Sequence, residues 1–124
     1  MKSEDSFSQI DDLIRQFSEL RDWDQFHTPK NLVLAATGEV GELAELLQWK
    51  SDEEIESYLQ SQEGRVRLSE EIADIAIYLI RLCQTNNLDF LAAIKQKIAI
   101  NETKYPVDGS KGNAIKYSDR EISD

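Results

Sequence analysis

Apolar residues recur at helical spacing along most of this chain, and no stretch resembles a convincing strand. Ile10, Leu13, Ile14 and Phe17 set this spacing in the first segment, where acids and glutamine stand between them. The chain contains only 5 Gly and 2 Pro, which argues against a loop-rich or all-β protein. With 40% hydrophobic residues, it can bury a core as a single domain of residues 1–124. The sequence therefore predicts an all-α fold, a bundle of four to five helices.

Capping residues mark where the helices begin. Thr28 is an N-cap before Pro29, and Asp89 caps the last helix. Ser51 and Glu54 match a capping box. The helices are predicted to span about residues 6–21, 29–50, 52–62, 66–84 and 90–104.

Three segments interrupt the helical pattern. DWDQFHTP contains two aromatic residues and the only histidine, and it is predicted to be a loop. Gly64 is expected to separate the short, polar third helix from the fourth. The stretch 107–124 is polar and contains glycine, so we expect a tail or loop there.

Two pairs of acids lie inside the two most apolar helices. Glu39 and Glu42 are three residues apart in one helix, and Glu71 and Asp74 are three apart in the other. Positions three apart share a helix face, so each helix presents two carboxylates beside an apolar surface. Four anions in a half-buried groove would repel one another and lose hydration. A hard divalent cation such as Mg²⁺ is the simplest compensation, and the chain has no Cys/His cluster for zinc.

An ordinary acidic helix surface is the alternative interpretation of these pairs. Acids at this spacing occur on many solvated helices. Arg67 and Arg81 could neutralise Glu71 and Asp74, since they lie one turn and two turns away on the same stripe. The chain would then be a non-catalytic helical interaction module.

Charge and composition limit the classes of partner. The formal net charge is −10, with 24 acidic and 14 basic residues, so we expect no binding to a nucleic acid polymer or to an anionic membrane. A small phosphorylated ligand is compatible with this charge if metal ions reverse the local field. No signal-peptide core or membrane-length apolar run occurs, which predicts a cytoplasmic protein. Cys83, the only cysteine, lies in an apolar run and is predicted to be a buried structural thiol.

Two features of the apolar helices suggest that something further covers them. The apolar arc of the fourth helix exceeds half its circumference, which predicts burial by its own bundle and by another subunit. Gly38 and Gly41 lie inside the second helix, where each costs ~1 kcal/mol relative to alanine. Close approach of a backbone or ligand would explain these glycines, and plain tolerance is the alternative.

Trp49 is seven residues from Glu42, about 10 Å by helical rise, and could stack on a nucleotide base.

With these motifs in place, the chain resembles the all-α nucleoside triphosphate pyrophosphohydrolases of the MazG type, especially the dCTP pyrophosphatase branch. The shared pattern is E-x-x-E, a spacer, and then E-x-x-D. The resemblance covers about residues 20–117 and is carried by RDWDQFHTPKNLVLAATGEVGELAELLQWKSDEE, EEIADIAIYLIRL and KIAINETKYPVDGSKGNAIKYSD.

The resemblance implies an enzyme that converts a nucleoside triphosphate and water to the monophosphate and pyrophosphate, by attack of water on the α-phosphorus. It implies that Mg²⁺ is the cofactor, with the catalytic, metal-binding carboxylates Glu39, Glu42, Glu71 and Asp74. The favoured substrate is dCTP or a modified deoxynucleotide. A dUTPase-like or broad-specificity pyrophosphatase is the alternative, because base choice depends on few pocket contacts. The resemblance also implies assembly, and we predict a homotetramer with a dimer as the fallback.

Substrate contacts are expected outside the acidic pairs. The resemblance marks base and sugar-pocket positions at His27, Trp49 and Tyr78, and nucleotide contacts at Asn101, Lys104 and Tyr105. Lys97 shares a helix face with Asn101 and Lys104 by its spacing. Lys111 is a candidate to close over the phosphates from the tail, and Trp23 is interpreted as simple packing.

Overall fold

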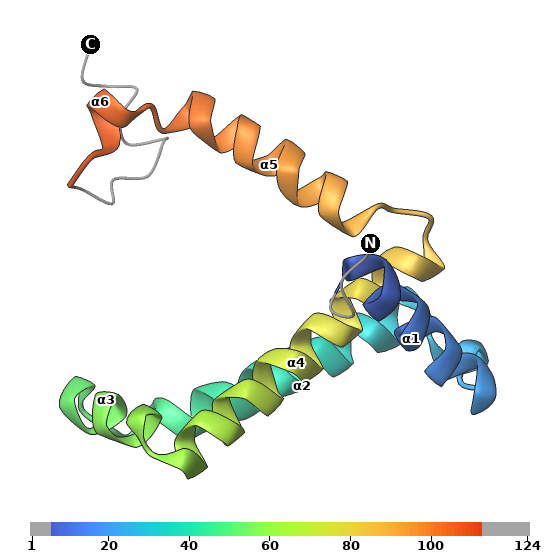
Figure 1. The fold of residues 1–124 in the computed structure, drawn as a ribbon, viewed down its shortest axis with the longest axis horizontal. Coiled ribbons are helices and arrows are strands. Elements are labelled where there is room, and N and C mark those ends of the chain that lie inside the picture. The colour runs from blue at the N-terminus through green and yellow to red at the C-terminus, as the bar shows by residue number, and fades with distance from the viewer. Residues whose placement is uncertain (1–5, 113–124) are drawn as a thin grey trace. The chain divides into compact units, whose positions relative to one another are not determined.

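Helices joined by short turns make up residues 6–112, the part of the chain that the computed structural model describes (Figure 1). No strand occurs among these residues, so the predicted all-α class is confirmed. The elements are α1 (Phe7–Leu20), the 3₁₀ helix η1 (Asp24–Phe26), α2 (Pro29–Leu47), α3 (Asp52–Gln60), α4 (Gln62–Thr85), α5 (Phe90–Lys104) and α6 (Val107–Ser110). The chain divides after Leu88 into two compact units, of which the first holds α1 to α4 and the second α5 and α6.

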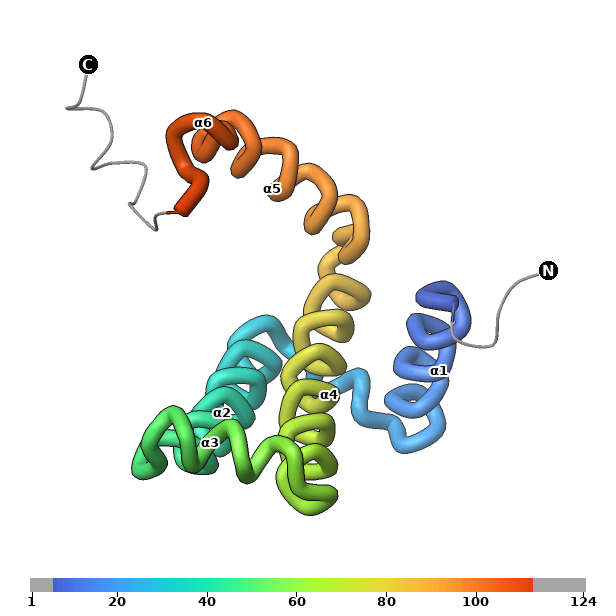
Figure 2. Tube along the Cα trace, turned by 60° about the vertical axis from the view of Figure 1, so that its left-hand side comes forward, coloured from blue at the N-terminus to red at the C-terminus, as the bar shows by residue number. Residues whose placement is uncertain are grey.

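The long helices α2 and α4 form the centre of the first unit. They lie side by side and run in opposite directions (Figure 1), while α1 and α3 each contact α4. In Figure 2, α2 and α3 lie on one side of α4 and α1 lies on the other. The buried apolar side chains come from all three long helices of this unit: Ile14, Leu32, Ala36 and Ile80. This small core fixes the facing sides of α2 and α4.

The predicted helix caps are present. The Thr28 hydroxyl oxygen accepts a hydrogen bond from the Asn31 amide at 3.2 Å, which starts α2. Ser51 and Glu54 form both bonds of a capping box at the start of α3. An oxygen of Asp89 accepts from the backbone amide of the third helical residue of α5 at 2.9 Å. These side chains satisfy amide groups that a helix start leaves without an intrahelical partner.

Two predicted helix boundaries are displaced by a few residues, and the start of the predicted tail is helical. α2 ends at Leu47, not near Lys50. The Lys50 amide donates to the Leu47 carbonyl at 3.1 Å, three residues back, and the Lys50 ammonium group donates to the Leu46 carbonyl at 2.7 Å. Trp49 therefore lies beyond the helix. α4 begins at Gln62 and includes Gly64 in its first turn. A one-turn helix, α6, occupies the start of the predicted tail, whereas 113–124 lie outside the described residues.

The end of α1 shapes the chain that follows it. Asp22 has a φ of 54°, the left-handed conformation that commonly closes a helix. The amide of Trp23 donates to the Ser18 carbonyl at 2.9 Å, and that of Asp22 donates to the Glu19 carbonyl at 3.1 Å. These two bonds form a Schellman motif. The motif turns the chain so that Trp23 returns to Phe17, with the two rings edge to face and their centroids 5.6 Å apart.

Many large apolar side chains stay exposed in the single chain. Val33 and Val40 of α2 are exposed, as are Ile72 and Leu79 of α4. Cys83 is only partly buried, contrary to its prediction as a buried thiol. No helix among the described residues has the length and hydropathy needed to cross a bilayer.

Gly64 lies where no larger residue fits. A Cβ atom at this position would stand 1.9 Å from the Tyr58 carbonyl oxygen, which is backbone and cannot rotate away. Gly41 offers a comparison, because nothing lies within 4 Å of a Cβ built there. The glycine at 64 is therefore required by the close passage of α3 against the start of α4.

We expect Gly64→Ala to lower the free energy of unfolding by about 1–3 kcal/mol, because the α3–α4 turn must shift to admit the methyl group. Chemical denaturation monitored by circular dichroism measures the change. The matched variant Gly41→Ala should instead gain up to ~1 kcal/mol from helix propensity. A Gly64→Ala protein as stable as the unmodified chain would contradict the close packing.

Candidate active site

Three carboxylates meet where α2 faces α4. One oxygen from each of Glu39, Glu42 and Glu71 lies within 4.8 Å of the other two. Glu39 and Glu42 come from consecutive turns of α2, and Glu71 comes from the facing side of α4. The antiparallel packing of the two helices therefore brings together acids that are distant in the sequence.

Two of these carboxylates each bury one oxygen that has no hydrogen-bond partner. Glu71 is only 7% exposed, and its Oε2 atom is buried with no hydrogen bond, as is Oε2 of Glu39. Burial, then the proximity of the Glu71 and Glu42 carboxyl groups and the negative charge of Asp74, raises the pKa of Glu39 to about 7. Unsatisfied carboxylate oxygens gathered in this way are the donor set that a hard divalent cation prefers. The three residues thus fit a metal centre.

Asp74 stands at the edge of this group. It is exposed and is not one of the three carboxylates that converge, although its charge acts on Glu39. The alternative that Arg81 neutralises Asp74 is wrong, because the Arg81 guanidinium pairs with Asp24. Arg67 does pair with Glu71, but at 3.9 Å and with half of its own side chain exposed. Such a long, solvated ion pair stabilises little and leaves the second Glu71 oxygen unsatisfied.

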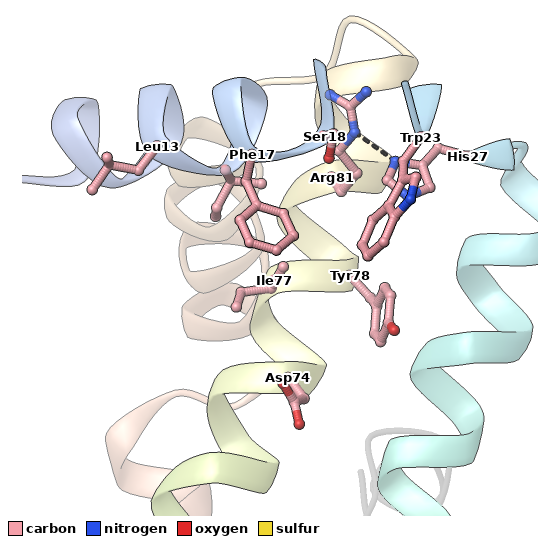
Figure 3. Close-up of a pocket in the computed structure, with 10 residues that line it drawn as sticks. Leu13, Phe17, Ser18, Trp23, His27, Asp74, Ile77, Tyr78 and Arg81 are labelled. Carbon is pink, nitrogen blue, oxygen red and sulfur yellow. Dashed lines mark hydrogen bonds between the residues drawn. The ribbon is translucent and has the colours of Figure 1, made fainter. Parts of the chain in front are cut away.

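An apolar pocket of about 420 Å³ lies beside the acidic group, further along α4 (Figure 3). This volume falls in the range of small-molecule sites. Figure 3 shows Asp74 at one end of the pocket, Tyr78 in the middle and Arg81 at the far end. α1 supplies an apolar wall that includes Leu13 and Phe17.

Sequence reasoning identified part of this pocket and missed the rest. His27 and Tyr78 line it, in the same pocket as Asp74. Trp23 also lines it, although it was interpreted as simple packing. The aromatic-rich segment DWDQFH was the available indication, but only the Schellman turn shows that the indole returns to the α1–α4 face. Trp49 is 87% exposed and is not among the residues that line this pocket.

The remaining predicted contacts belong to the second unit and are described by themselves. Lys97, Asn101 and Lys104 all lie on α5, as predicted, and the first two are exposed. Tyr105 follows as the C-cap, and its amide donates to the Asn101 carbonyl at 2.7 Å. Lys111 is exposed and ends α6. Their roles toward a nucleotide stay predictions.

Comparison with known proteins places the chain among pyrophosphatases. Residues 34–119 match the MazG-like family. The chain is 47% identical over 117 residues to dCTP pyrophosphatase 1 of Bos taurus, which covers 94% of this chain and 69% of that protein. It is 41% identical over 116 residues to dCTP pyrophosphatase 1 of Homo sapiens, covering 94% and 68%. The crystal structure of a pyrophosphatase from Archaeoglobus fulgidus superposes with a TM-score of 0.76 at 37% identity, over 86% of this chain and 97% of that one.

The raised pKa of Glu39 makes stability depend on pH in a defined direction. A carboxyl with a higher pKa in the folded chain binds its proton more tightly when folded, so stability is lost as pH rises from about 4.5 to about 7. We expect Glu39→Gln to remove this loss in protein treated with a chelator. Thermal unfolding across this pH range measures it, and the exposed acid of the same helix gives the control Glu45→Gln. Identical pH profiles for the Glu39→Gln and unmodified proteins would contradict the burial of this carboxyl.

Proposed function

The chain belongs to the MazG-like family, and we propose that it hydrolyses dCTP or a related deoxynucleoside triphosphate to the monophosphate and pyrophosphate. The activity class follows from its relatives, which are dCTP pyrophosphatases and a pyrophosphatase of known structure. The observation that carries the proposal is the group of three carboxylates beside an apolar pocket of small-molecule size. A dUTPase-like or broad-specificity enzyme is the second candidate, because few contacts choose the base.

Mg²⁺ is the cation that we propose for the acidic group, held by Glu39, Glu42 and Glu71, with Asp74 at its edge. The support is chemical, because Mg²⁺ prefers oxygen ligands and keeps several waters, so a few carboxylates suffice. Bound there, the ion would neutralise triphosphate charge and make water acidic enough to attack near neutral pH. The unsatisfied oxygens of Glu39 and Glu71 are the specific fit.

The residues of α2 and α4 orient the reaction. With the triphosphate at the acids, a water oxygen bonds to the α-phosphorus, and the bond from that phosphorus to the α–β bridging oxygen breaks. Pyrophosphate leaves with the bridging oxygen, and the proton of the water passes to a nearby proton acceptor. Because Asp74 lies at the pocket end nearest the acids, the base can extend from there toward Tyr78 and Trp23. Aromatic stacking is worth about 1–3 kcal/mol per base.

The phosphates of a bound nucleotide would need basic and amide side chains as partners. We propose that the nucleotide is contacted by Lys97, Asn101, Lys104, Tyr105 and Lys111. Ammonium groups and amide donors suit phosphate oxygens, and charge-assisted hydrogen bonds of this kind are the strong ones. A chain with net charge −10 needs such local donors to hold an anionic substrate.

A homotetramer, with a dimer as the fallback, is the assembly that we propose. Large apolar side chains of α2 and α4 remain exposed in the single chain, Val40 and Ile72 among them. In such an assembly, the exposed Trp49 is available to the pocket of a neighbouring copy.

The remaining partners follow from charge. The net charge of −10 opposes binding to nucleic acid polymers and anionic membranes, so a free nucleotide is the proposed ligand. The cytoplasmic location remains a proposal from the sequence.

Pyrophosphate release from a panel of deoxynucleoside triphosphates, with and without Mg²⁺, tests the function. We expect release only with the metal and fastest from dCTP. Glu71→Gln should lower turnover at least ~100-fold, because it removes a proposed ligand oxygen. The neighbouring exposed acid supplies the matched control Glu70→Gln, which should retain activity. A helical interaction module would release no pyrophosphate under either condition.

Trp23→Ala should raise KM for the nucleotide by about tenfold, because it removes a stacking surface from the pocket. Phe26→Ala is the control, since this aromatic residue lies in the same 3₁₀ helix, is exposed and does not line the pocket. Steady-state kinetics measure the effect on the nucleotide, and calorimetric titration of Mg²⁺ measures the effect on metal binding. An unchanged KM, or an equal loss of metal binding, would show that Trp23 serves only in packing.

A further inference from the structure

Arg81 is a buried arginine that the proposed reaction does not use. It is only 5% exposed, at the end of the pocket furthest from the acids. Its Nε atom donates to Nδ1 of His27 at 2.9 Å, and its Nη1 donates to the side-chain oxygen of Gln84 at 3.0 Å. Its Nη2 forms an ion pair with Asp24. The guanidinium thus joins α4 to the segment that carries both His27 and Trp23.

The contact with Arg81 determines where His27 carries its proton. A guanidinium group can only donate, so Nδ1 of His27 must accept and must be unprotonated. The proton of the neutral ring is then on Nε2. A doubly protonated ring would place an N–H group against the Arg81 N–H.

The electrostatic surroundings of His27 agree with a neutral ring. Burial, and after it the positive charge of Arg81, lowers the pKa of His27, while Asp24 acts in the opposite direction. Asp74 and Tyr78 on α4 are the other titratable groups that line the pocket. The described pocket wall from α1 contributes no titratable side chain.

A second link holds α1 in the same network. The Gln84 amide nitrogen donates to the backbone carbonyl of Asp11 at 2.9 Å and to its carboxylate at 2.7 Å. Because the Gln84 oxygen already accepts from Arg81, the amide has one orientation. Arg81 therefore fixes the histidine and, through Gln84, the helix that forms the opposite wall.

We propose that Arg81 is a positioning residue that holds His27 in the neutral tautomer protonated on Nε2, so that the pocket presents one fixed hydrogen-bond donor. Nε2 has no partner among the described residues, and His27 lines the pocket. The donor favours a base with a carbonyl oxygen or an unprotonated ring nitrogen at that point, as cytosine has. This selection rests on the proposed function, in which the base occupies the pocket.

The chain's only histidine makes a direct test possible. Long-range ¹H–¹⁵N NMR of the uniformly labelled full chain reports both imidazole nitrogens without ambiguity. We expect a mostly neutral ring at pH 6.5, the ordinary pKa of histidine, with the proton on Nε2. A ring that is half protonated at this pH, or one with its proton on Nδ1, would overturn the inference.

Arg81→Met removes the donors and keeps a stem of similar length. The imidazole ring of His27 should then exchange between its two neutral tautomers. The pKa of His27 should rise toward or above 6.5, because Asp24 loses its partner Arg81 and its negative charge favours the protonated ring. Arg65→Met, an exposed arginine of the same helix, is the control and should leave the NMR signals of His27 unchanged. A single Nε2–H tautomer retained in folded Arg81→Met would contradict the role of Arg81. If that variant does not fold, the spectrum of the unmodified protein decides alone.

Two further measurements separate this inference from the proposed function. Deoxycytidine monophosphate, the expected product, should shift the His27 Nε2 signal. His27→Phe should raise KM for dCTP about tenfold with a smaller change in kcat, whereas His27→Gln, which keeps a donor, should recover part of the loss. Pyrophosphate release without any shift of the His27 signals would overturn the base-selecting role and leave the proposed function standing. Absence of release from every nucleotide would contradict the proposed function, whatever the tautomer.

Discussion

The facing of α2 against α4 gathers three carboxylates and buries one oxygen of Glu39 and one of Glu71 without a hydrogen-bond partner. The buried contacts of Leu32, Ala36 and Ile80 bring the two helices together, and the same packing strips water from carboxylate oxygens of Glu39 and Glu71. The folded chain can carry this charge by holding a proton on Glu39 or by binding a cation. The proposed chemistry depends on the cation, because a cation that relieves the repulsion between the carboxylates would also bind a triphosphate.

One face of α4 connects this acidic group with a region of different chemistry. Glu71, Asp74, Tyr78 and Arg81 follow one another at helical spacing, so they span about 15 Å by helical rise. The first two are acids suited to metal and phosphate, and the others belong to an aromatic, largely apolar pocket. A nucleotide has the same division between its charged phosphates and its flat base. The order of residues along a single helix therefore matches the order of groups along the proposed substrate.

The single chain buries few of its apolar side chains. Ile14 links α1 to the small core, yet Ile72 and Leu79 of α4 and Val40 of α2 remain exposed. A helix that is apolar on more than half its circumference requires cover on more than one side. The proposed assembly would supply that cover.

Local interactions were determined by the sequence itself. The helical periodicity, the N-cap at Thr28 and the bounds of α5 all depend on residues within a few positions of one another, and each was predicted correctly. The meeting of Glu39 with Glu71 could be inferred only as a pattern of two apolar helices. Only the tertiary structure shows that Arg81 donates a hydrogen bond to His27 and does not pair with Asp74 of its own helix. Arg81 and His27 are 54 residues apart in the sequence. Helical spacing predicts neighbours along one helix, whereas a buried guanidinium takes whichever acceptors the packing of other segments brings to it.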